Sequence, residues 1–293
     1  MPLATIHDLL TSPPDEVEGL FKKASSLCDV YENFLTEDPG DTHTRLPGIH
    51  ASEISGCDRR IVYSLIGMER RELSGAPWRR RFRIGHAVHE MFQRDFKRMA
   101  RQMGLSAVQD WHISFEEELP IAPRLQVLAN EWSIYSHCDG VFTIREHWGG
   151  PVVLRVLLEI KTKSPTQYEL LMKKAQPDPD HIEQAHVYMA CLDVPVTWFL
   201  YYNKGNQNYT GTDSSFLTRF DPTLWASLEA RFRRAHDAAG AAVSLDGRLL
   251  EENLPPREES VKCDFCAFSW TCRPARLNGA RKPAWQALRG PDD

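Results

Sequence analysis

The segment that most constrains the fold is residues 151–163, with the sequence PVVLRVLLEIKTK. Its first part is a nearly continuous apolar run of strand length, which is typical of a strand buried on both faces of a sheet. The run ends in Glu159 and Lys161, and charges at a buried strand end cost desolvation free energy unless they are paired or bound to a metal. Because side chains alternate along a strand, Glu159 and Lys161 share one face, about 6–7 Å apart, while Ile160 points into the core. The tripeptide alone fits either a solvated ion pair or a catalytic site.

The composition is that of an ordinary globular protein and leaves the function open. With 293 residues, 42% of them hydrophobic, the chain can form one large or two modest domains. Its formal net charge of −5 gives no general attraction for nucleic acid, so such binding needs a local basic patch. No apolar run approaches the roughly 18 residues of a membrane span, and the N-terminal residues lack the features of a signal peptide. These patterns predict a soluble, cytoplasmic protein without a membrane partner.

Apolar spacing and turn residues predict a mixture of helices and strands, which indicates an α/β protein. The predicted helices cover residues 12–35, 52–67, 78–103, 167–175, 180–192 and 222–245. The predicted strands cover residues 111–118, 132–144, 151–163, 195–202 and 208–220. In the second helix, Ser52 is the predicted N-cap and Cys57 lies in the first turns.

Three regions follow from this pattern. Residues 1–47 form a helical extension and linker, residues 48–250 form the main domain, and residues 251–293 form a C-terminal segment that contains cysteines. The amphipathic first helix is either a packing element or a surface for a protein partner.

Two polar residues precede the charged strand end in the chain. The helix over 78–103 carries His89 on its apolar stripe, and Gly85 one turn earlier leaves open space beside it. A histidine in such a place is more often a hydrogen-bonded core residue than a ligand. Asp139 is followed by Gly140 at a predicted strand bend, where a plain turn is the commoner use of aspartate.

On the helix over 180–192, Gln184 and Tyr188 lie one turn apart on one face. In their order along the chain, these motifs resemble the PD-(D/E)XK nuclease superfamily, specifically its RecB-like exonuclease branch. The resemblance is carried by Gly85-x-x-x-His89-Glu90, Asp139-Gly140, Glu159-Ile160-Lys161 and Gln184-x-x-x-Tyr188. It covers about residues 52–272 and implies a restriction-endonuclease-like core, in which helices flank a central mixed sheet.

The resemblance implies a metal-dependent deoxyribonuclease. The expected activity is that of an exonuclease on single-stranded DNA or DNA ends, in recombination, repair or phage DNA metabolism within a bacterial or phage-infected host cell. No GxxxxGK[ST] loop occurs, so the ATP-driven motor of some relatives is absent. The alternative is a non-catalytic nucleic-acid-binding subunit of a larger complex, whose fold is stabilised by a zinc or iron–sulfur site. The complete set of His, Asp, Glu and Lys argues against that alternative, because a binding module does not need all four.

The resemblance also implies a metal site. His89, Asp139 and Glu159, with the carbonyl of Ile160, would hold Mg²⁺ or Mn²⁺. Carboxylate oxygens suit both ions, and one imidazole shifts the preference toward Mn²⁺. Asp139 follows Ser-His-Cys rather than the glycine and apolar residues common at this place in the family, so His137 is a rival ligand.

The remaining site residues are expected to act on the water and the substrate. By resemblance, Lys161 would orient the attacking water or stabilise the transition state. Gln184 and Tyr188 would hold the substrate strand near the site, and Tyr188 could do so by stacking on a base.

The cysteines indicate a second metal site. Seven cysteines make an odd number, which argues against a disulfide framework. Cys263, Cys266 and Cys272 are closely spaced, and Cys57 is the candidate fourth ligand, so the spacing leaves both Zn²⁺ and an iron–sulfur cluster open. The arrangement of one cysteine before the nuclease motifs and three after them resembles that of the iron–sulfur nucleases of the AddB and CRISPR-associated exonuclease type. This resemblance favours a [4Fe–4S] cluster. The other cysteines are interpreted as core thiols: Cys28, Cys138 and Cys191.

A basic run opens the helix that carries His89. It consists of Arg79, Arg80, Arg81 and Arg83. Such a run is usually a solvated face, but in an acidic protein and next to the candidate site it is at least as well explained as a track for DNA phosphates.

Overall fold

The computed structural model describes residues 48–70, 76–104, 112–119, 134–210, 216–258 and 261–273. The predicted helix over 12–35, with its candidate partner surface, and Cys28 lie outside these residues. The chain divides into two units, one of Met1–Thr44 with Leu73–Ile84 and one of Arg45–Glu72 with Gly85–Asp293. None of the described helices is long and apolar enough to cross a membrane.

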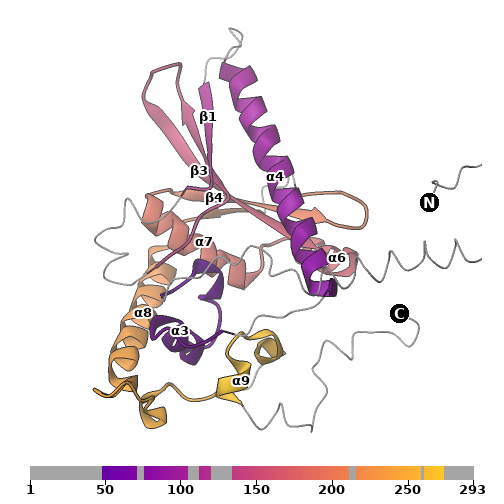
Figure 1. Ribbon diagram of the computed structural model, residues 1–293. Helices are drawn as coiled ribbons and strands as arrows, with labels where there is room; N and C mark the ends of the chain where they lie inside the picture. Colours follow the sequence, from indigo (N-terminus) through magenta and orange to yellow (C-terminus); the bar gives the residue numbers. More distant parts are fainter. Residues whose placement is uncertain are drawn as a thin grey trace, which may run out of the picture. The chain divides into compact units, whose positions relative to one another are not determined.

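The second unit contains a five-stranded sheet whose order in space is the order in sequence (Figure 1). Its strands are β1 (His112–Glu117), β2 (Gly140–Arg145), β3 (Val152–Lys163), β4 (Val196–Asn203) and β5 (Leu217–Arg219). Strands β3 and β4 are parallel, and the other neighbours are antiparallel. This mixed sheet between helices confirms the predicted α/β fold.

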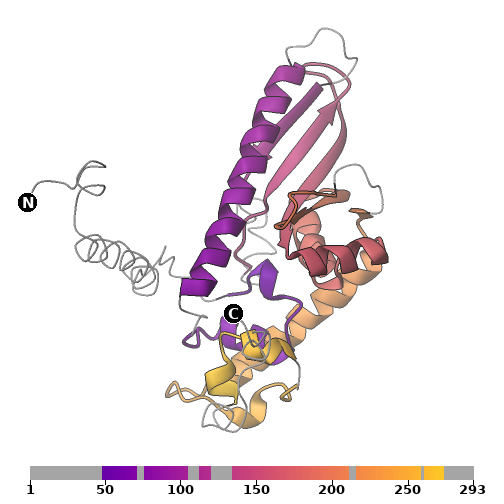
Figure 2. The same cartoon turned by 90° about the vertical axis from the view of Figure 1, so that its right-hand side faces the viewer.

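The alternation of side chains along β3 separates two layers of core. Leu158 and Ile160 pack with Phe92 of α4 (Ala76–Gly104), whereas Leu157 packs with residues of α7 (Pro179–Leu192). Figure 2 shows α4 along one side of the sheet and the helices of the β3–β4 connection on the other. Glu159 and Lys161 share a face of β3 with Leu157 and lie opposite Ile160, as the sequence predicts. The structure adds that this charged face turns toward α7.

The parallel pairing of β3 with β4 requires a crossover, which α6 (Pro165–Lys174) and α7 provide. Helix α6 begins with a capping box, in which Ser164 and Gln167 bond to each other's backbone N–H. Helix α7 begins differently, because the side chain of its N-cap Asp178 makes no capping bond. That carboxylate is therefore available for another partner.

Burial of β3 is less complete than the sequence predicts. Val152 is 46% exposed and Val153 61% exposed, whereas the stretch from Leu157 to Ile160 is fully buried. Strand β4 pairs with β3 only from Val156 onward, so among the described residues the start of β3 has a neighbouring strand on one side only. A run of apolar residues cannot reveal where its neighbouring strand begins.

The helix predicted over 52–67 is wrong at its start. A 3₁₀ turn (Ala51–Glu53) comes first, and the helix proper is α3 (Asp58–Leu65) with Cys57 as its N-cap. The guanidinium of Arg231, on α8 (Pro222–Ala242), donates to the carbonyls of Ile54 and Gly56 and pairs with Asp58. These carbonyls need no helical partner, so the chain turns before α3 begins.

Candidate active site

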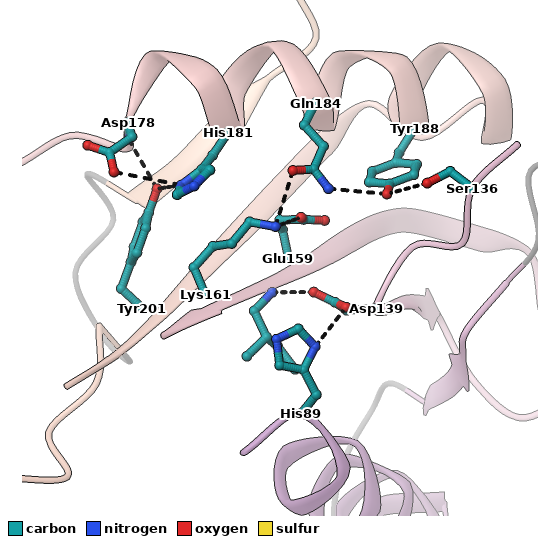
Figure 3. Close-up of polar contacts among 11 residues, drawn as sticks. His89, Ser136, Asp139, Glu159, Lys161, Asp178, His181, Gln184, Tyr188 and Tyr201 are labelled. Atoms are coloured by element: carbon teal, nitrogen blue, oxygen red, sulfur yellow. Dashed lines mark hydrogen bonds and ion pairs between the residues drawn. The ribbon is translucent and has the colours of Figure 1, made fainter. Parts of the chain in front are cut away.

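Asp139, immediately before β2, is the centre of a group of polar contacts (Figure 3). Its Oδ1 lies 3.0 Å from Nδ1 of His89, and its Oδ2 accepts a hydrogen bond of 2.6 Å from the backbone N–H of Ile160. The Asp139 carbonyl accepts a further bond of 2.9 Å from Nε2 of Gln93, one turn after His89 on α4. Asp139 is thereby fixed between α4 and the end of β3.

Gly140 explains how the backbone brings Asp139 to this position. A Cβ atom at Gly140 would lie 2.4 Å from the ring of Phe115 on β1. No other residue fits there without moving the ring, so the glycine after Asp139 permits close packing of β1 against β2.

Glu159 and Lys161 begin a second chain of contacts on the α7 side. Glu159 is 1% exposed, and its Oε1 is paired with the ammonium of Lys161. That ammonium also donates to Oε1 of Gln184 at 3.2 Å, and Nε2 of Gln184 donates to the hydroxyl of Tyr188 at 3.2 Å. The second carboxylate oxygen of Glu159 is buried and has no hydrogen-bond partner among the residues that the structure describes. A buried, unused carboxylate oxygen is costly unless it binds a further group.

The electrostatics of the two carboxylates differ. Burial raises the pKa of Glu159 to about 7, although the Lys161 ammonium acts in the opposite direction. Burial acts the same way on Asp139, but the hydrogen bond and charge of His89 prevail and lower its pKa. The same contact raises the pKa of His89 against the effect of burial. Without a further cation, Glu159 is thus the carboxylate whose negative charge is least stabilised.

The site draws on both layers of the protein. His89 comes from α4 on one side of the sheet, Gln184 comes from α7 on the other, and Asp139 and Glu159 lie between them at the strand ends (Figure 3). Seven residues predicted from the sequence are brought together here: His89, Asp139, Glu159, Ile160, Lys161, Gln184 and Tyr188.

Two predicted roles change with the geometry. Tyr188 is 2% exposed, and its hydroxyl lies 2.9 Å from Oγ of Ser136, so its ring has no face free for a base in this structure. Tyr188 instead holds Gln184 in place. His137, the rival ligand, is exposed, whereas His89 contacts Asp139 directly.

Sequence reasoning missed two residues of the site. Gln93 follows His89 by four residues on α4, and this helical spacing could have revealed it. Ser136 lies outside the regular elements, and nothing in its sequence context indicated a contact with Tyr188.

The donor set fits a hard divalent cation. Among the described residues, no three His, Cys, Asp or Glu side chains are grouped so that they could hold a metal ion as they stand. His89 and Asp139 are bonded to each other, and Glu159 is paired with Lys161. The unpartnered Glu159 oxygen and the two carboxylates nevertheless provide the oxygen donors that Mg²⁺ and Mn²⁺ prefer.

The cysteine-containing segment lines a separate pocket. Cys57, Cys263, Cys266 and Cys272 line one pocket, although the chain separates the first from the others by about 200 residues. Phe268 is fully buried against Tyr63 of α3, with ring centroids 5.5 Å apart, and this contact holds the segment on α3. Burial raises the pKa of the Cys57 and Cys266 thiols, so they stay protonated unless a bound cation stabilises the thiolate form.

The basic run lies in the first turns of α4. Arg80, Arg81 and Arg83 are exposed, and Arg79 is partly buried. These turns belong to the first of the two units, whereas His89 belongs to the second.

Comparisons with known proteins give distant structural similarities. No protein-family model matches the sequence, and no curated protein matches it. The crystal structure of an alkaline exonuclease (LHK-Exo) from Laribacter hongkongensis is 18% identical, with a TM-score of 0.44, over 68% of this chain and 90% of that chain. LHK-Exo in complex with dAMP is 19% identical over the same shares, with a TM-score of 0.42. The "Crystal structure of SSO0001" is 14% identical over 86% of this chain and 97% of that chain, with a TM-score of 0.45. None of these similarities is close enough to define the function of this chain.

Proposed function

We propose that this chain is a metal-dependent nuclease that hydrolyses phosphodiester bonds of DNA, and that it acts as an exonuclease on single strands or ends. The observation that carries this proposal is the end of β3, where one carboxylate oxygen of the buried Glu159 has no partner in the described part of the chain. The ammonium of Lys161 lies beside it, and Asp139 and His89 lie across the strand end. A buried carboxylate oxygen without a hydrogen-bond partner destabilises the fold, so its presence favours a role in binding a cation or in catalysis.

Each residue of the site has a role in this chemistry. His89, Asp139, Glu159 and the Ile160 carbonyl would hold Mg²⁺ or Mn²⁺. When bound, such a cation activates water and neutralises charge on the scissile phosphate. Lys161, fixed by Glu159 and Gln184, orients the attacking water or stabilises negative charge on the phosphate oxygens.

A non-catalytic nucleic-acid-binding subunit remains the alternative function. Burying Glu159 and Lys161 costs desolvation free energy that a binding surface does not require. The buried pair therefore favours catalysis over binding alone.

The first test compares linear and circular forms of one single-stranded DNA. With Mn²⁺ or Mg²⁺, we expect degradation of end-labelled linear single strands, slower attack on blunt duplex, and little or none on closed circles. EDTA should stop the reaction. The reason is that one metal centre at one strand end serves one DNA strand, and the chain has no ATP motor to separate a duplex. Equal rates on linear and circular DNA would instead identify an endonuclease, and no cleavage with either ion would favour the non-catalytic alternative.

We also propose that the four pocket cysteines hold a [4Fe–4S] cluster, with zinc as the alternative. Among the residues that line the pocket, four arginines (Arg59, Arg60, Arg257 and Arg273) outnumber the one carboxylate, Glu258, and this excess of positive charge favours an anionic cluster. Such a cluster would join the C-terminal segment covalently to the start of α3.

The basic run is proposed to contact DNA phosphates. In the double variant Arg80→Ala/Arg81→Ala, we expect affinity for single-stranded DNA to fall similarly for all sequences. A plot of log affinity against log salt should flatten by about 0.7 for each phosphate that the variant no longer binds. Fluorescence anisotropy at several salt concentrations measures both quantities. The exposed Arg233 and Arg234 of α8 provide a matched control pair, and an unchanged slope in the first variant would mean that the run is only a solvated face.

A further inference from the structure

A second polar cluster lies next to the candidate active site and was not predicted from the sequence. It includes His181 and Asp178 at the start of α7 and Tyr201 on β4, which Figure 3 labels. Its fourth member is Lys163 at the end of β3. Nδ1 of His181 lies 2.8 Å from the Tyr201 hydroxyl, and the backbone N–H of Asp178 donates to the same hydroxyl at 3.1 Å. The Asp178 carboxylate is paired with the ammonium of Lys163. Lys163 thus positions Asp178, Asp178 positions the Tyr201 hydroxyl, and that hydroxyl positions the imidazole of His181.

The hydrogen bonds define the tautomer of His181. The Tyr201 oxygen already accepts from the N–H of Asp178, and its own proton needs an acceptor. Nδ1 of His181 is the acceptor within reach, so in a neutral imidazole the proton lies on Nε2. The opposite tautomer would leave the buried Tyr201 hydroxyl proton without a partner among the described residues. His181 therefore presents an N–H donor on the side away from Tyr201.

The imidazole is also kept neutral. Burial lowers the pKa of His181 to about 3, and the positive charges of Lys161 and Lys163 contribute to this shift. A neutral donor can bind an anionic oxygen between two lysines without adding a third charge to the site.

The Nε2 donor is accessible and unused. The side chain of His181 is 21% exposed, and within the described part of the chain Nδ1 accounts for all of its polar contacts. His181 lies one turn before Gln184 on the same face of α7, and Lys163 lies two residues after Lys161 on the same face of β3. The cluster is therefore displaced from the contact between Lys161 and Gln184 by one helical turn along α7 and by two residues along β3. Two residues of strand span about 6.6 Å, a distance similar to that between successive phosphates of one nucleic-acid strand.

We propose that Nε2–H of His181 donates a hydrogen bond to a non-bridging oxygen of the phosphate next to the scissile one. This inference rests on the proposed nuclease function and adds a substrate-contacting residue to it. Tyr201, Asp178 and Lys163 act as positioning residues that fix the tautomer and direction of the imidazole. A substrate without the anionic oxygen at this neighbouring phosphate offers the imidazole a much weaker acceptor.

The test combines variants of His181 with DNA in which one phosphate at a time is replaced by a neutral methylphosphonate. The matched variants are His181→Phe, which keeps a ring but has no donor, and His181→Gln, whose amide N–H comes close to Nε2. On unmodified DNA we expect His181→Phe to lower kcat/KM about ten- to a hundredfold and His181→Gln to recover much of it. Methylphosphonate at the neighbouring linkage should slow the wild type by a similar factor but should slow His181→Phe little further.

The exposed His147, in the β2–β3 turn, provides a control. His147→Phe should keep the wild-type rate and the wild-type response to methylphosphonate. Equal rates for wild type and His181→Phe, or independent losses from the variant and the modified linkage, would overturn the proposal.

A second measurement does not depend on activity. The ¹⁵N shifts of labelled imidazoles should show His181 as the neutral Nε2–H tautomer near pH 7 in the wild-type protein. A proton on Nδ1 or a charged ring would overturn the proposal. If the wild type cleaves no DNA with either metal ion, the nuclease function fails; if it cleaves and His181→Phe is unchanged, only the present inference fails.

Discussion

Lys161→Met should lower metal-dependent DNA cleavage by about a hundred- to a thousandfold while DNA affinity stays within a few-fold of the wild type. Methionine keeps the length and the apolar stem of lysine but removes the ammonium that Glu159 and Gln184 hold at the end of β3. The variant lacks only the group that orients water or stabilises charge in the transition state, so kcat should fall much more than binding. Single-turnover cleavage of end-labelled DNA and anisotropy titration in EDTA measure the two quantities.

Two companion variants make this prediction specific. Glu159→Gln and Asp139→Asn keep the size of the side chain and one acceptor oxygen but remove a charged metal ligand, so both should also abolish cleavage. Lys173→Met makes the same lysine replacement at an exposed position of α6 and should cut at the wild-type rate. Wild-type rates in the Lys161, Glu159 and Asp139 variants would show that the active site lies elsewhere.

Replacement of any pocket cysteine by serine should produce the second large effect. Anaerobically purified wild-type protein should be brown, with a broad visible absorption that dithionite bleaches, and each of the variants Cys57→Ser, Cys263→Ser, Cys266→Ser and Cys272→Ser should lose this colour. A link that closes a loop of about 200 residues stabilises a fold by about 5 kcal/mol in the chain-entropy description. We therefore expect the melting temperature of these variants to fall by roughly 10–20 °C.

The buried thiols elsewhere in the protein provide the control. Cys191, on α7, is buried and does not line the pocket, so Cys191→Ala should keep the visible absorption. Metal analysis separates the two candidate cofactors. Stoichiometric zinc without iron would exclude the iron–sulfur cluster and leave the zinc alternative.

The sequence predicts best those features that depend on local periodicity. Side chains alternate between the two faces of any strand, so Glu159 and Lys161 are predicted on one face and Ile160 on the other. The structure has these three side chains on the predicted faces. Likewise, Gln184 and Tyr188 are one helical turn apart whatever surrounds them, and they do contact each other. Such features need no knowledge of the tertiary fold.

The features that the sequence does not predict depend on distant partners. Cys57 is the N-cap of α3, and Arg231, far along the chain, accounts for the carbonyls just before it. Tyr188 packs in the core, and its hydroxyl contacts Ser136, from a segment without regular structure. His181 acquires a defined tautomer only through Tyr201 on β4. In each case the local pattern is compatible with several environments, and tertiary packing selects one of them.

The separation of Cys57 from the other pocket cysteines has a consequence for biosynthesis. A ribosome releases the chain N-terminus first, so the strands and helices that carry His89, Lys161 and Gln184 are complete before Cys263 is translated. If the four thiolates hold one cofactor, as proposed, that cofactor can be inserted only after the residues of the sheet have been translated. In cells short of it, chains would then contain every residue of the candidate active site but lack the link between the C-terminal segment and α3.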